Sequence, residues 1–318
     1  MKYISIGGRQ ASVFALGSTD FGGKLNEAAS RALLDAFADA GGNYIDTAHV
    51  YGDFVTPKNG ESERVIDKWM DENRLHGRIF LSTKGAHHVL GTAPAGRLSR
   101  AEILKDVSES LDCLRTDHVD IYWLHRDNTA FSAGEVMETL QELVERGMTR
   151  LLGASNWSTA RILEANAYAR AHGLTPFYAN QPQFSLAVQT KPDDHSLVQA
   201  DAEMLKMHKD AGMLMTPYSS QAKGFLTLLD EKGEEGLPDK ARRRFLTDEN
   251  RAIYARCKEI SNETGLSVGA LALLWLRRQP FPLVPLVGAS RPEQLKPVFE
   301  AADADISAEQ AEYIRKAL

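Results

Sequence analysis

Residues 43–52 read N-Y-I-D-T-A-H-V-Y-G, and this stretch decides how the rest of the chain is interpreted. Tyr44 and Ile45 begin a short apolar run, and Asp46 follows where that run should continue. An ionisable side chain at the end of a buried strand costs free energy unless it is paired or used in chemistry. Tyr51 comes five positions later, on the loop that must leave the strand. The stretch therefore predicts a buried strand whose end carries functional side chains.

Two other strand-like runs end in the same way. Residues 78–84 (R-I-F-L-S-T-K) end on Lys84, and residues 119–125 (V-D-I-Y-W-L-H) end on His125. If these strands are parallel neighbours of the first, their last side chains meet Asp46 and Tyr51 at one edge of the sheet.

Strand-like runs alternate with helical patterns along the whole chain. Apolar alternation around Gly7-Gly8 predicts an N-terminal β-hairpin, and eight strand-and-helix units follow it. The expected strands are residues 14–19, 44–48, 79–84, 119–125, 150–155, 177–182, 214–219 and 283–289. Eight such units in 318 residues fit an α/β fold, a closed (β/α)8 TIM barrel that forms a single domain over residues 1–318. A doubly wound open sheet is the competing architecture, but no G-x-G-x-x-G motif follows the first strand.

Three of the connections between these strands lead to specific expectations. Residues 193–211 are expected to form the helix before the seventh strand. Residues 85–98 and 221–244 exceed ordinary connector length, so we expect them to form long loops over the substrate face.

Composition narrows the class of protein. The chain is 43% hydrophobic and 25% charged, as in ordinary globular proteins, and its formal charge of -6 argues against a dedicated nucleic-acid binder. The basic run of residues 242–244 is expected to be solvated helix surface. Cys113 and Cys257 give neither a disulfide framework nor metal-ligand spacing. With no apolar leader pattern and no 18-residue apolar run, we expect a cytoplasmic protein without a membrane partner. The oligomeric state stays open.

The four strand-end side chains suit proton donation to a carbonyl oxygen. A free tyrosine, with a pKa of about 10, is too weak an acid to protonate an alkoxide efficiently at neutral pH. An ammonium about 4 Å away would stabilise a phenolate by roughly 4 kcal/mol at an effective dielectric of about 20, so Lys84 would strengthen Tyr51 as an acid. Asp46 would keep Lys84 charged, and His125 would bond the same substrate oxygen. A carbonyl gains this negative charge when a hydride attacks it, which requires a reduced nicotinamide or flavin.

The remaining strand ends carry groups that could hold such a cofactor. Ser155, Asn156 and Gln181 supply hydroxyl and amide groups suited to a carboxamide. Tyr218 could stack on a nicotinamide ring, and Ser219 with the amides beyond it could meet a pyrophosphate. Backbone donors and an arginine suited to phosphate follow the last strand, at Gly288, Ala289, Ser290 and Arg291.

Each of these residues alone also has a structural explanation. Asp46 and Lys84 could form an ion pair between adjacent strands, and His125 could be a hydrogen-bonded core histidine. Lys84 could instead form a Schiff base in a lyase, which requires a neutral amine in an apolar pocket. His87 and His88 have no carboxylate or cysteine at ligand spacing, so we expect surface loop residues and no metal site.

In this order the motifs resemble those of the aldo-keto reductase family over nearly the whole chain. They are N-Y-I-D-T-A-H-V-Y-G, G-E-S-E-R-V-I, L-S-T-K, L-D-C-L-R-T-D-H-V-D-I-Y-W-L-H-R, G-A-S-N-W, Q-P-Q-F-S, P-Y-S-S and P-L-V-G-A-S-R-P-E-Q-L. The resemblance implies a (β/α)8 barrel that uses NADPH to reduce an aldehyde or ketone. It implies a catalytic acid at Tyr51 supported by Asp46, Lys84 and His125. The cofactor contacts that it implies are Ser155, Asn156, Gln181, Tyr218, Ser219, Gly288, Ser290, Arg291 and Gln294.

The sequence departs from the family pattern near the cofactor and at the substrate mouth. Pro297 and Val298 stand where the family often has Glu-Asn at the adenine end of the cofactor. Arg291 still favours a 2′-phosphate, and hence NADPH over NADH. His49 stands beside the expected substrate mouth. The expected walls of the substrate pocket include Phe21, Phe54, Trp123 and Trp157. Because the resemblance extends to potassium-channel β-subunits, an NADPH-binding redox sensor is the alternative to an enzyme.

Overall fold

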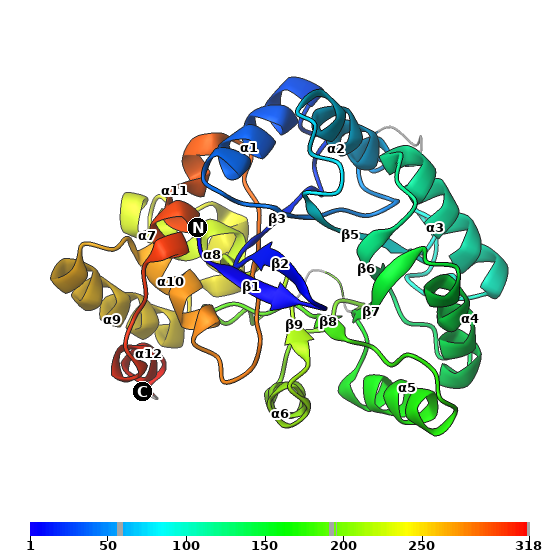
Figure 1. Ribbon diagram of the computed structural model, residues 1–318. Helices are drawn as coiled ribbons and strands as arrows, with labels where there is room; N and C mark the ends of the chain where they lie inside the picture. The colour runs from blue at the N-terminus through cyan, green and yellow to red at the C-terminus, as the bar shows by residue number, and fades with distance from the viewer. Residues whose placement is uncertain (56–59, 191–193, 195, 317–318) are drawn as a thin grey trace.

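The computed structural model describes residues 1–55, 60–190, 194 and 196–316. These residues form an eight-stranded parallel sheet at the centre of the molecule, with helices around it (Figure 1). Each strand from β4 to β9 pairs with its predecessor, and β10 pairs with β3. The strands are β3 (Ala15–Gly17), β4 (Tyr44–Asp46), β5 (Phe80–Gly85), β6 (Val119–Leu124), β7 (Thr149–Ser155), β8 (Ala179–Gln181), β9 (Leu214–Met215) and β10 (Leu286–Val287).

Hydrogen bonds between the two ends of the sheet close it into a barrel. Met215 N donates to Pro282 O at 2.9 Å, and Val284 N donates back to Met215 O at 2.9 Å. Ala15 N then donates to Pro285 O at 3.0 Å, so the segment entering β10 lies between β9 and β3. The predicted (β/α)8 barrel is thereby confirmed.

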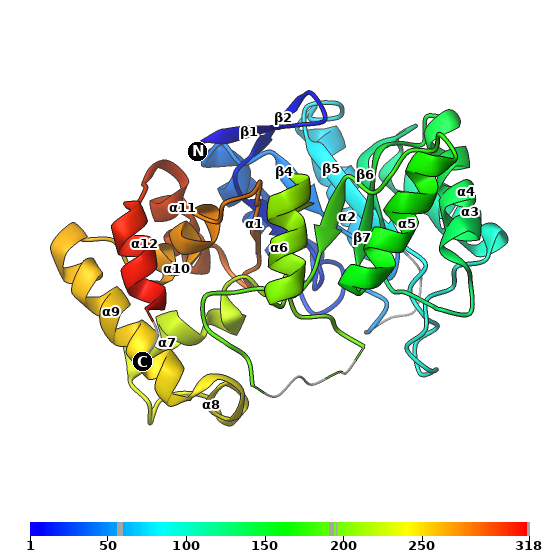
Figure 2. The same ribbon diagram turned by 90° about the horizontal axis from the view of Figure 1, so that it is seen from below.

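A hairpin of β1 (Tyr3–Ile6) and β2 (Arg9–Ser12) lies at one end of the barrel, opposite the α7 and α8 segment (Figure 2). Ile6 and Ala11 of this hairpin pack into the inner core cluster together with Trp123. Gly153 makes room for that indole, because a Cβ at this position would lie 2.1 Å from the Trp123 ring. The barrel interior is therefore filled by side chains at the hairpin end, which leaves the other end for a site.

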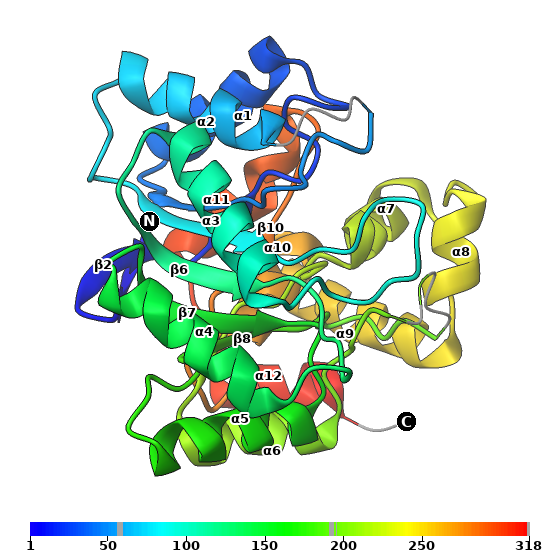
Figure 3. The ribbon, with the colours of Figure 1, turned by 90° about the vertical axis from the view of Figure 1, so that its right-hand side faces the viewer.

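The larger core cluster lies between the sheet and the helices outside it. Helices α2 to α6 follow one another around the sheet (Figure 3). Ser99 caps α3, and Ser132 with Glu135 forms a capping box at α4. The helices that alternate with the strands are α1 (Glu27–Asp39), α2 (Glu61–Glu72), α3 (Arg100–Leu114), α4 (Ala133–Glu145), α5 (Thr159–Ala171), α6 (Ala202–Ala211), α10 (Val268–Arg277) and α11 (Lys296–Asp303), with α12 (Ala308–Arg315) at the end.

Two expectations about the connections are wrong. Helix α6 begins after its cap Asp201 rather than at residue 193, because residues 198–200 run extended against Gln183; residues 193 and 195 lie outside the described part. Residues 221–244 are not a loop. They hold η1 (Ala222–Gly224), α7 (Phe225–Lys232) and most of α8 (Asp239–Phe245), and the unpredicted α9 (Asp248–Thr264) follows. Within the described residues, no helix combines the length and apolar character needed to cross a membrane.

Candidate active site

A cavity of about 1010 Å³ lies at the carboxyl ends of the strands. Its lining includes the last residues of five strands: Gly17, Asp46, Ser155, Gln181 and Val287. Every site residue predicted from the sequence lines this cavity except Lys84, which lies behind Asp46 and Tyr51. The long connections after β5 and β9 also contribute to its walls. The predicted site residues therefore gather in one place.

Asp46 and Lys84 form an ion pair at the base of this cavity, and each is 1% exposed. Register places Asp46 of β4 opposite Ser82 of β5, whose hydroxyl donates to Asp46 Oδ1 at 2.6 Å. Lys84 Nζ also donates to the Thr47 carbonyl oxygen at 2.7 Å, and Gln181 Nε2 donates to Asp46 Oδ1 at 3.2 Å. Burial alone would lower the pKa of Lys84, but its interactions with Asp46 and Tyr51 outweigh burial and raise this pKa above its ordinary value. Lys84 is thus a fixed, buried cation.

Tyr51 and His125 lie next to this cation. Lys84 Nζ is 4.6 Å from the centroid of the Tyr51 ring. The rings of Tyr51 and His125 are 5.6 Å apart between centroids, with an interplanar angle of 78°. Ser62 N donates to the Tyr51 carbonyl oxygen at 3.2 Å, which holds the loop of Tyr51 against the first turn of α2. Acid, phenol, amine and imidazole groups thus meet at one point of the cavity.

The His125 ring is neutral at physiological pH. Burial, followed by the nearby His87, Arg126 and Lys84, holds the pKa of His125 well below its ordinary value. The His87 ring lies against it, with 4.7 Å between the ring centroids. Within the described part of the chain, His125 Nδ1 has no hydrogen-bond partner. A neutral imidazole in this position can donate a hydrogen bond to a substrate oxygen without carrying a charge.

Hydrogen bonds connect the residues predicted to hold a carboxamide. Ser155 Oγ donates to the Gln181 carbonyl oxygen at 2.9 Å. Asn156 Nδ2 donates to the His125 carbonyl oxygen at 3.2 Å, and Asn156 Oδ1 accepts from the Tyr218 hydroxyl at 2.8 Å. Since Gln181 also contacts Asp46, this network is continuous with the buried ion pair.

The wall after β9 has the backbone geometry of an anion-binding turn. Ser219, Ala222, Lys223 and Gly224 have φ angles of 53°, 48°, 57° and 77°, all in the left-handed region. Closely spaced left-handed residues turn successive N–H groups toward one concave side. Helix α7 begins after Gly224 without a side-chain cap; Phe225 N donates to the Ala222 carbonyl oxygen, and the N–H groups that follow it in the first turn can meet a ligand. This wall suits a phosphate.

The turn after β10 forms the facing wall. Gly288 N donates to Gln221 Oε1 at 3.1 Å, and Ser290 N donates to Gln294 Oε1 at 2.8 Å. Arg291 is exposed at the rim of the cavity. At the positions where this chain departs from the family pattern, Pro297 lines the cavity, whereas the Val298 side chain is fully buried in the core.

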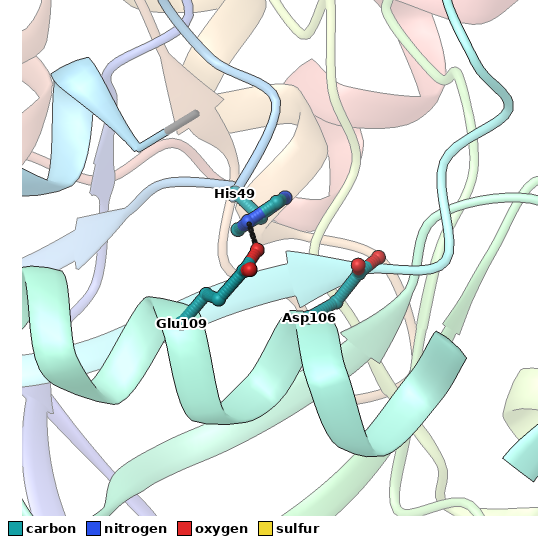
Figure 4. Close-up of side chains that lie close together, drawn as sticks. All are labelled: His49, Asp106 and Glu109. Atoms are coloured by element: carbon teal, nitrogen blue, oxygen red, sulfur yellow. Dashed lines mark hydrogen bonds and ion pairs between the residues drawn. The ribbon is translucent and has the colours of Figure 1, made fainter. Parts of the chain in front are cut away.

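Four expectations about the surroundings of the site are wrong. His49 does not line the cavity: its Nε2 lies 2.8 Å from Glu109 Oε2 on α3 (Figure 4). His87 is buried beside His125 instead of lying at the surface. Trp123 on β6 is fully buried inside the barrel, and Trp157, which follows β7, is fully buried in the larger core cluster beside Phe177. Phe21 and Phe54 line the cavity as predicted.

Two arginines line the cavity that the sequence did not predict there. Arg244 was expected on a solvated helix face, but it is 7% exposed and lines the cavity because α8 packs there. Arg126 was given no role, yet it is 8% exposed and lines the cavity directly after His125. The sequence did contain a sign of Arg126: it is a charged residue directly after the end of a buried strand, where functional residues are common.

One group of side chains in the described part could hold a metal ion. His49, Asp106 and Glu109 offer ligand atoms within 4.8 Å of one another (Figure 4). However, the Asp106 carboxylate is already ion-paired with Arg97 and accepts a hydrogen bond from Ala86 N at 2.8 Å. We assign no metal to this group.

Comparisons with known proteins agree with this fold. The family model described as "Aldo/keto reductase family" matches residues 14–318. A probable aryl-alcohol dehydrogenase of Saccharomyces cerevisiae is 30% identical over 305 residues, which cover 92% of this chain and 88% of that protein. A probable voltage-gated potassium channel subunit beta of Oryza sativa subsp. japonica is 28% identical over 316 residues, covering 95% and 92%. The crystal structure of a thermostable aldo-keto reductase with the inhibitor epalrestat has a TM-score of 0.72 at 22% identity, covers 99% of both chains, and shows the same fold.

Proposed function

Because this chain belongs to the aldo/keto reductase family, and is thus an oxidoreductase that acts on carbonyl compounds, we propose that it reduces an aldehyde or ketone with NADPH and that Tyr51 is the proton donor. The observation that carries this proposal is the buried Lys84 ammonium, 4.6 Å from the Tyr51 ring centroid and ion-paired with Asp46. We treat residues 1–318 as one catalytic domain.

The chain's own residues would handle the proton. A reduced nicotinamide, when bound, supplies the hydride that adds to the carbonyl carbon. The carbonyl oxygen then gains negative charge, and Tyr51 gives it the phenolic proton, so that the product is an alcohol. Lys84 stabilises the phenolate that remains on Tyr51, and Asp46 holds the ammonium in place.

His125 would orient the carbonyl rather than protonate it. The ring is neutral because burial, with the neighbouring cations and histidines, depresses the pKa of His125. A neutral ring donates an N–H to the carbonyl oxygen and leaves Tyr51 as the acid. The Tyr51 O–H and the His125 N–H both donate to the carbonyl oxygen and hold the carbonyl group so that one face meets the hydride.

The donor set of the cavity fits a nicotinamide dinucleotide. Hydroxyl and amide groups of Ser155, Asn156 and Gln181 suit the carboxamide, and the Tyr218 ring suits stacking on the nicotinamide. The left-handed turn beginning at Ser219 and the uncapped start of α7 suit the pyrophosphate. The groups proposed for the adenosine phosphate are Gly288, Ser290, Arg291 and Gln294. The guanidinium of Arg291 favours NADPH, whose 2′-phosphate it can bind, over NADH.

A Tyr51→Phe variant tests the proposal. Aldehydes and ketones are assayed with NADPH and with NADH, and NADPH binding is measured separately by fluorescence titration. We expect turnover to fall at least about a hundredfold, since general acid catalysis supplies 10²–10⁴, while NADPH binds as in the wild type. Carbonyl reduction at an unchanged rate by Tyr51→Phe would remove the phenol from its role.

The second candidate function is a redox sensor that binds NADPH with little turnover. It is supported by the similarity to the rice potassium channel subunit. A single-turnover experiment separates the two functions. Bound NADPH is mixed with an excess of each aldehyde and its oxidation is followed. Slow oxidation with every aldehyde would favour the sensor, whereas fast oxidation with one of them supports the reductase.

The geometry argues against a Schiff-base lyase at Lys84. Such chemistry requires a neutral amine, but the ion pair with Asp46 keeps Lys84 charged. Borohydride trapping with a carbonyl compound checks this point: a covalent adduct at Lys84 would favour the lyase.

A further inference from the structure

The guanidinium of Arg126 lies in the part of the cavity where the substrate would bind. Arg126 follows His125 directly at the end of β6, lines the cavity and is only 8% exposed. Its NH1 donates to the His125 carbonyl oxygen at 2.9 Å, which anchors the side chain beside the proposed catalytic groups.

This buried cation lacks a matching anion. No carboxylate oxygen within 4.0 Å forms an ion pair with Arg126 anywhere in residues 1–55, 60–190, 194 and 196–316, and over the same residues its Nε has no hydrogen-bond partner. A guanidinium has five N–H donors and stays charged, so most of its binding capacity is unused. Burying a charge without a partner is unfavourable, and a bound anion would offset this cost.

The groups around Arg126 do not supply that anion. Its neighbours His87 and His125 are neutral at pH 7, since burial lowers the pKa of His87 to about 3 and that of His125 well below its ordinary value. Asp194 attracts Arg126 electrostatically but forms no ion pair with it, and its carboxylate accepts hydrogen bonds from Ser196. Burial likewise lowers the pKa of Arg126, as expected for an uncompensated cation.

The position of Arg126 points to the substrate rather than the cofactor. Its electrostatic partners Tyr218 and Tyr51 belong to the catalytic end of the cavity, whereas the phosphate-like walls lie after β9 and β10. Phe54 lines the same region and stands edge-on to His87, with 6.4 Å between ring centroids. A flat substrate therefore meets an aromatic wall and a cation close to its carbonyl group.

We propose that Arg126 binds a carboxylate of the substrate, and that the preferred substrate is an oxo acid, such as an aryl aldehyde with a ring carboxylate. The guanidinium pairs with the carboxylate while the carbonyl group faces Tyr51 and His125. This inference rests on the proposed carbonyl reduction.

The experiment compares substrates of equal shape and different charge. 4-Carboxybenzaldehyde is paired with 4-carbamoylbenzaldehyde, and the 3-substituted isomers form a second pair. Each is assayed with NADPH on the wild type, on Arg126→Gln and on Arg170→Gln, a control at an exposed arginine of α5. NADPH affinity is measured for all three proteins.

We expect the wild type to prefer one carboxylate over its amide at least about tenfold in kcat/KM, because hydrogen bonds between charged groups are the strong ones. Arg126→Gln should lose this preference, mainly through a higher KM for the carboxylate. The amide substrates should change by less than about threefold in Arg126→Gln, and Arg170→Gln should behave as the wild type.

Three outcomes would overturn the proposal. One is a wild type without preference in either pair. The second is an equal loss for carboxylate and amide, which would mean that Arg126 only holds the His125 backbone. The third is weaker NADPH binding with the preference retained, which would assign the guanidinium to the cofactor.

Failure of the proposed reduction can be told apart from failure of the Arg126 proposal. It would appear as no turnover of any of the four aldehydes, or as full activity in Tyr51→Phe. In that case the binding of benzoate and benzamide to the protein with NADP⁺ still tests Arg126. In fluorescence titrations, the wild type should bind benzoate more tightly than benzamide. Arg126→Gln should bind the two compounds equally. Equal affinities in the wild type would overturn the assignment.

Discussion

Asp46 and Lys84 are buried deeply enough that neither can lose its partner without consequence. Removal of one member of a buried ion pair costs about 3–5 kcal/mol, because the other charge stays buried and uncompensated. We predict that Asp46→Asn lowers the unfolding free energy by about 3 kcal/mol and turnover at least about tenfold. Urea unfolding and steady-state kinetics measure the two effects.

The double variant Asp46→Asn/Lys84→Met is the matched control, since it removes both charges. It should recover most of the lost stability and none of the activity. A double variant no more stable than Asp46→Asn would show that the buried charge is not the cause. Unchanged turnover in Asp46→Asn would show that Lys84 does not need Asp46 to support Tyr51.

At the same scale, the strand-end side chains could be predicted from the sequence, whereas two histidines of the loops could not. Asp46, Lys84 and His125 each end an apolar run, which fixes their place in a parallel barrel. His49 and His87 lie in irregular segments, where no periodicity tells which way a side chain points. The His49 backbone bonds the Lys84 carbonyl oxygen at 2.9 Å, while its ring reaches α3.

Among the elements, the helices of residues 221–246 were missed for a physical reason. Helices α7 and α8 span eight and seven residues, too short for a clear apolar period, and Gly233, Gly236 and Pro238 between them are typical of loops. Helices of this length are marginal alone and gain their stability from tertiary packing. Here that packing centres on Phe225 and Phe245, whose stacked rings lie 5.4 Å apart between centroids.

Helices α7 and α8 thus form a cover beside the cavity. We predict that Phe245→Ala loosens this cover and weakens cofactor binding. Loss of a buried phenyl ring costs about 3–5 kcal/mol, and Phe245 is 1% exposed. Hydrogen exchange should accelerate in residues 222–246 before it does in the barrel strands. NADPH affinity should fall about tenfold, because the start of α7 borders the cavity.

Phe245→Leu, which keeps most of the volume, should show a smaller change in both measurements. If Phe245→Ala accelerated exchange equally throughout the barrel, the cover would be part of one cooperative unit. If NADPH affinity did not change, α7 would not shape the cofactor site.

For the molecule as a whole, strand order and closure could be predicted, but not strand length. Residues 214–219 and 283–289 were expected as full strands, yet β9 and β10 are two residues each. Pro217, Pro282 and Pro285 have no N–H to donate, so the regular ladder is interrupted. Their carbonyl oxygens still accept the bonds that close the barrel, which is why the topology survives.

Buried neutral histidines make the stability of the whole molecule depend on pH. Burial lowers the pKa of His87 to about 3, and it also lowers the pKa values of His125 and His208. Between pH 6.5 and 3 the unfolded chain binds a proton at His87 that the folded chain does not bind. The unfolding free energy therefore falls as the pH falls below 6.5, by at most about 1.4 kcal/mol per pH unit for each such group.

We predict that urea unfolding at pH 7.5, 6.5 and 5 shows this loss, and that His87→Gln reduces the part between pH 6.5 and 5 by about 1 kcal/mol. Burial raises the pKa of Glu63, so Glu63 binds its proton more tightly in the folded chain and partly offsets the loss in both proteins.

His172→Gln is the control, because this side chain is exposed at the end of α5. It should lose as much stability in acid as the wild type. A His87→Gln variant with the wild-type pH dependence would show that the ring beside His125 takes up its proton without unfolding, and that the cavity stays wet enough to solvate it.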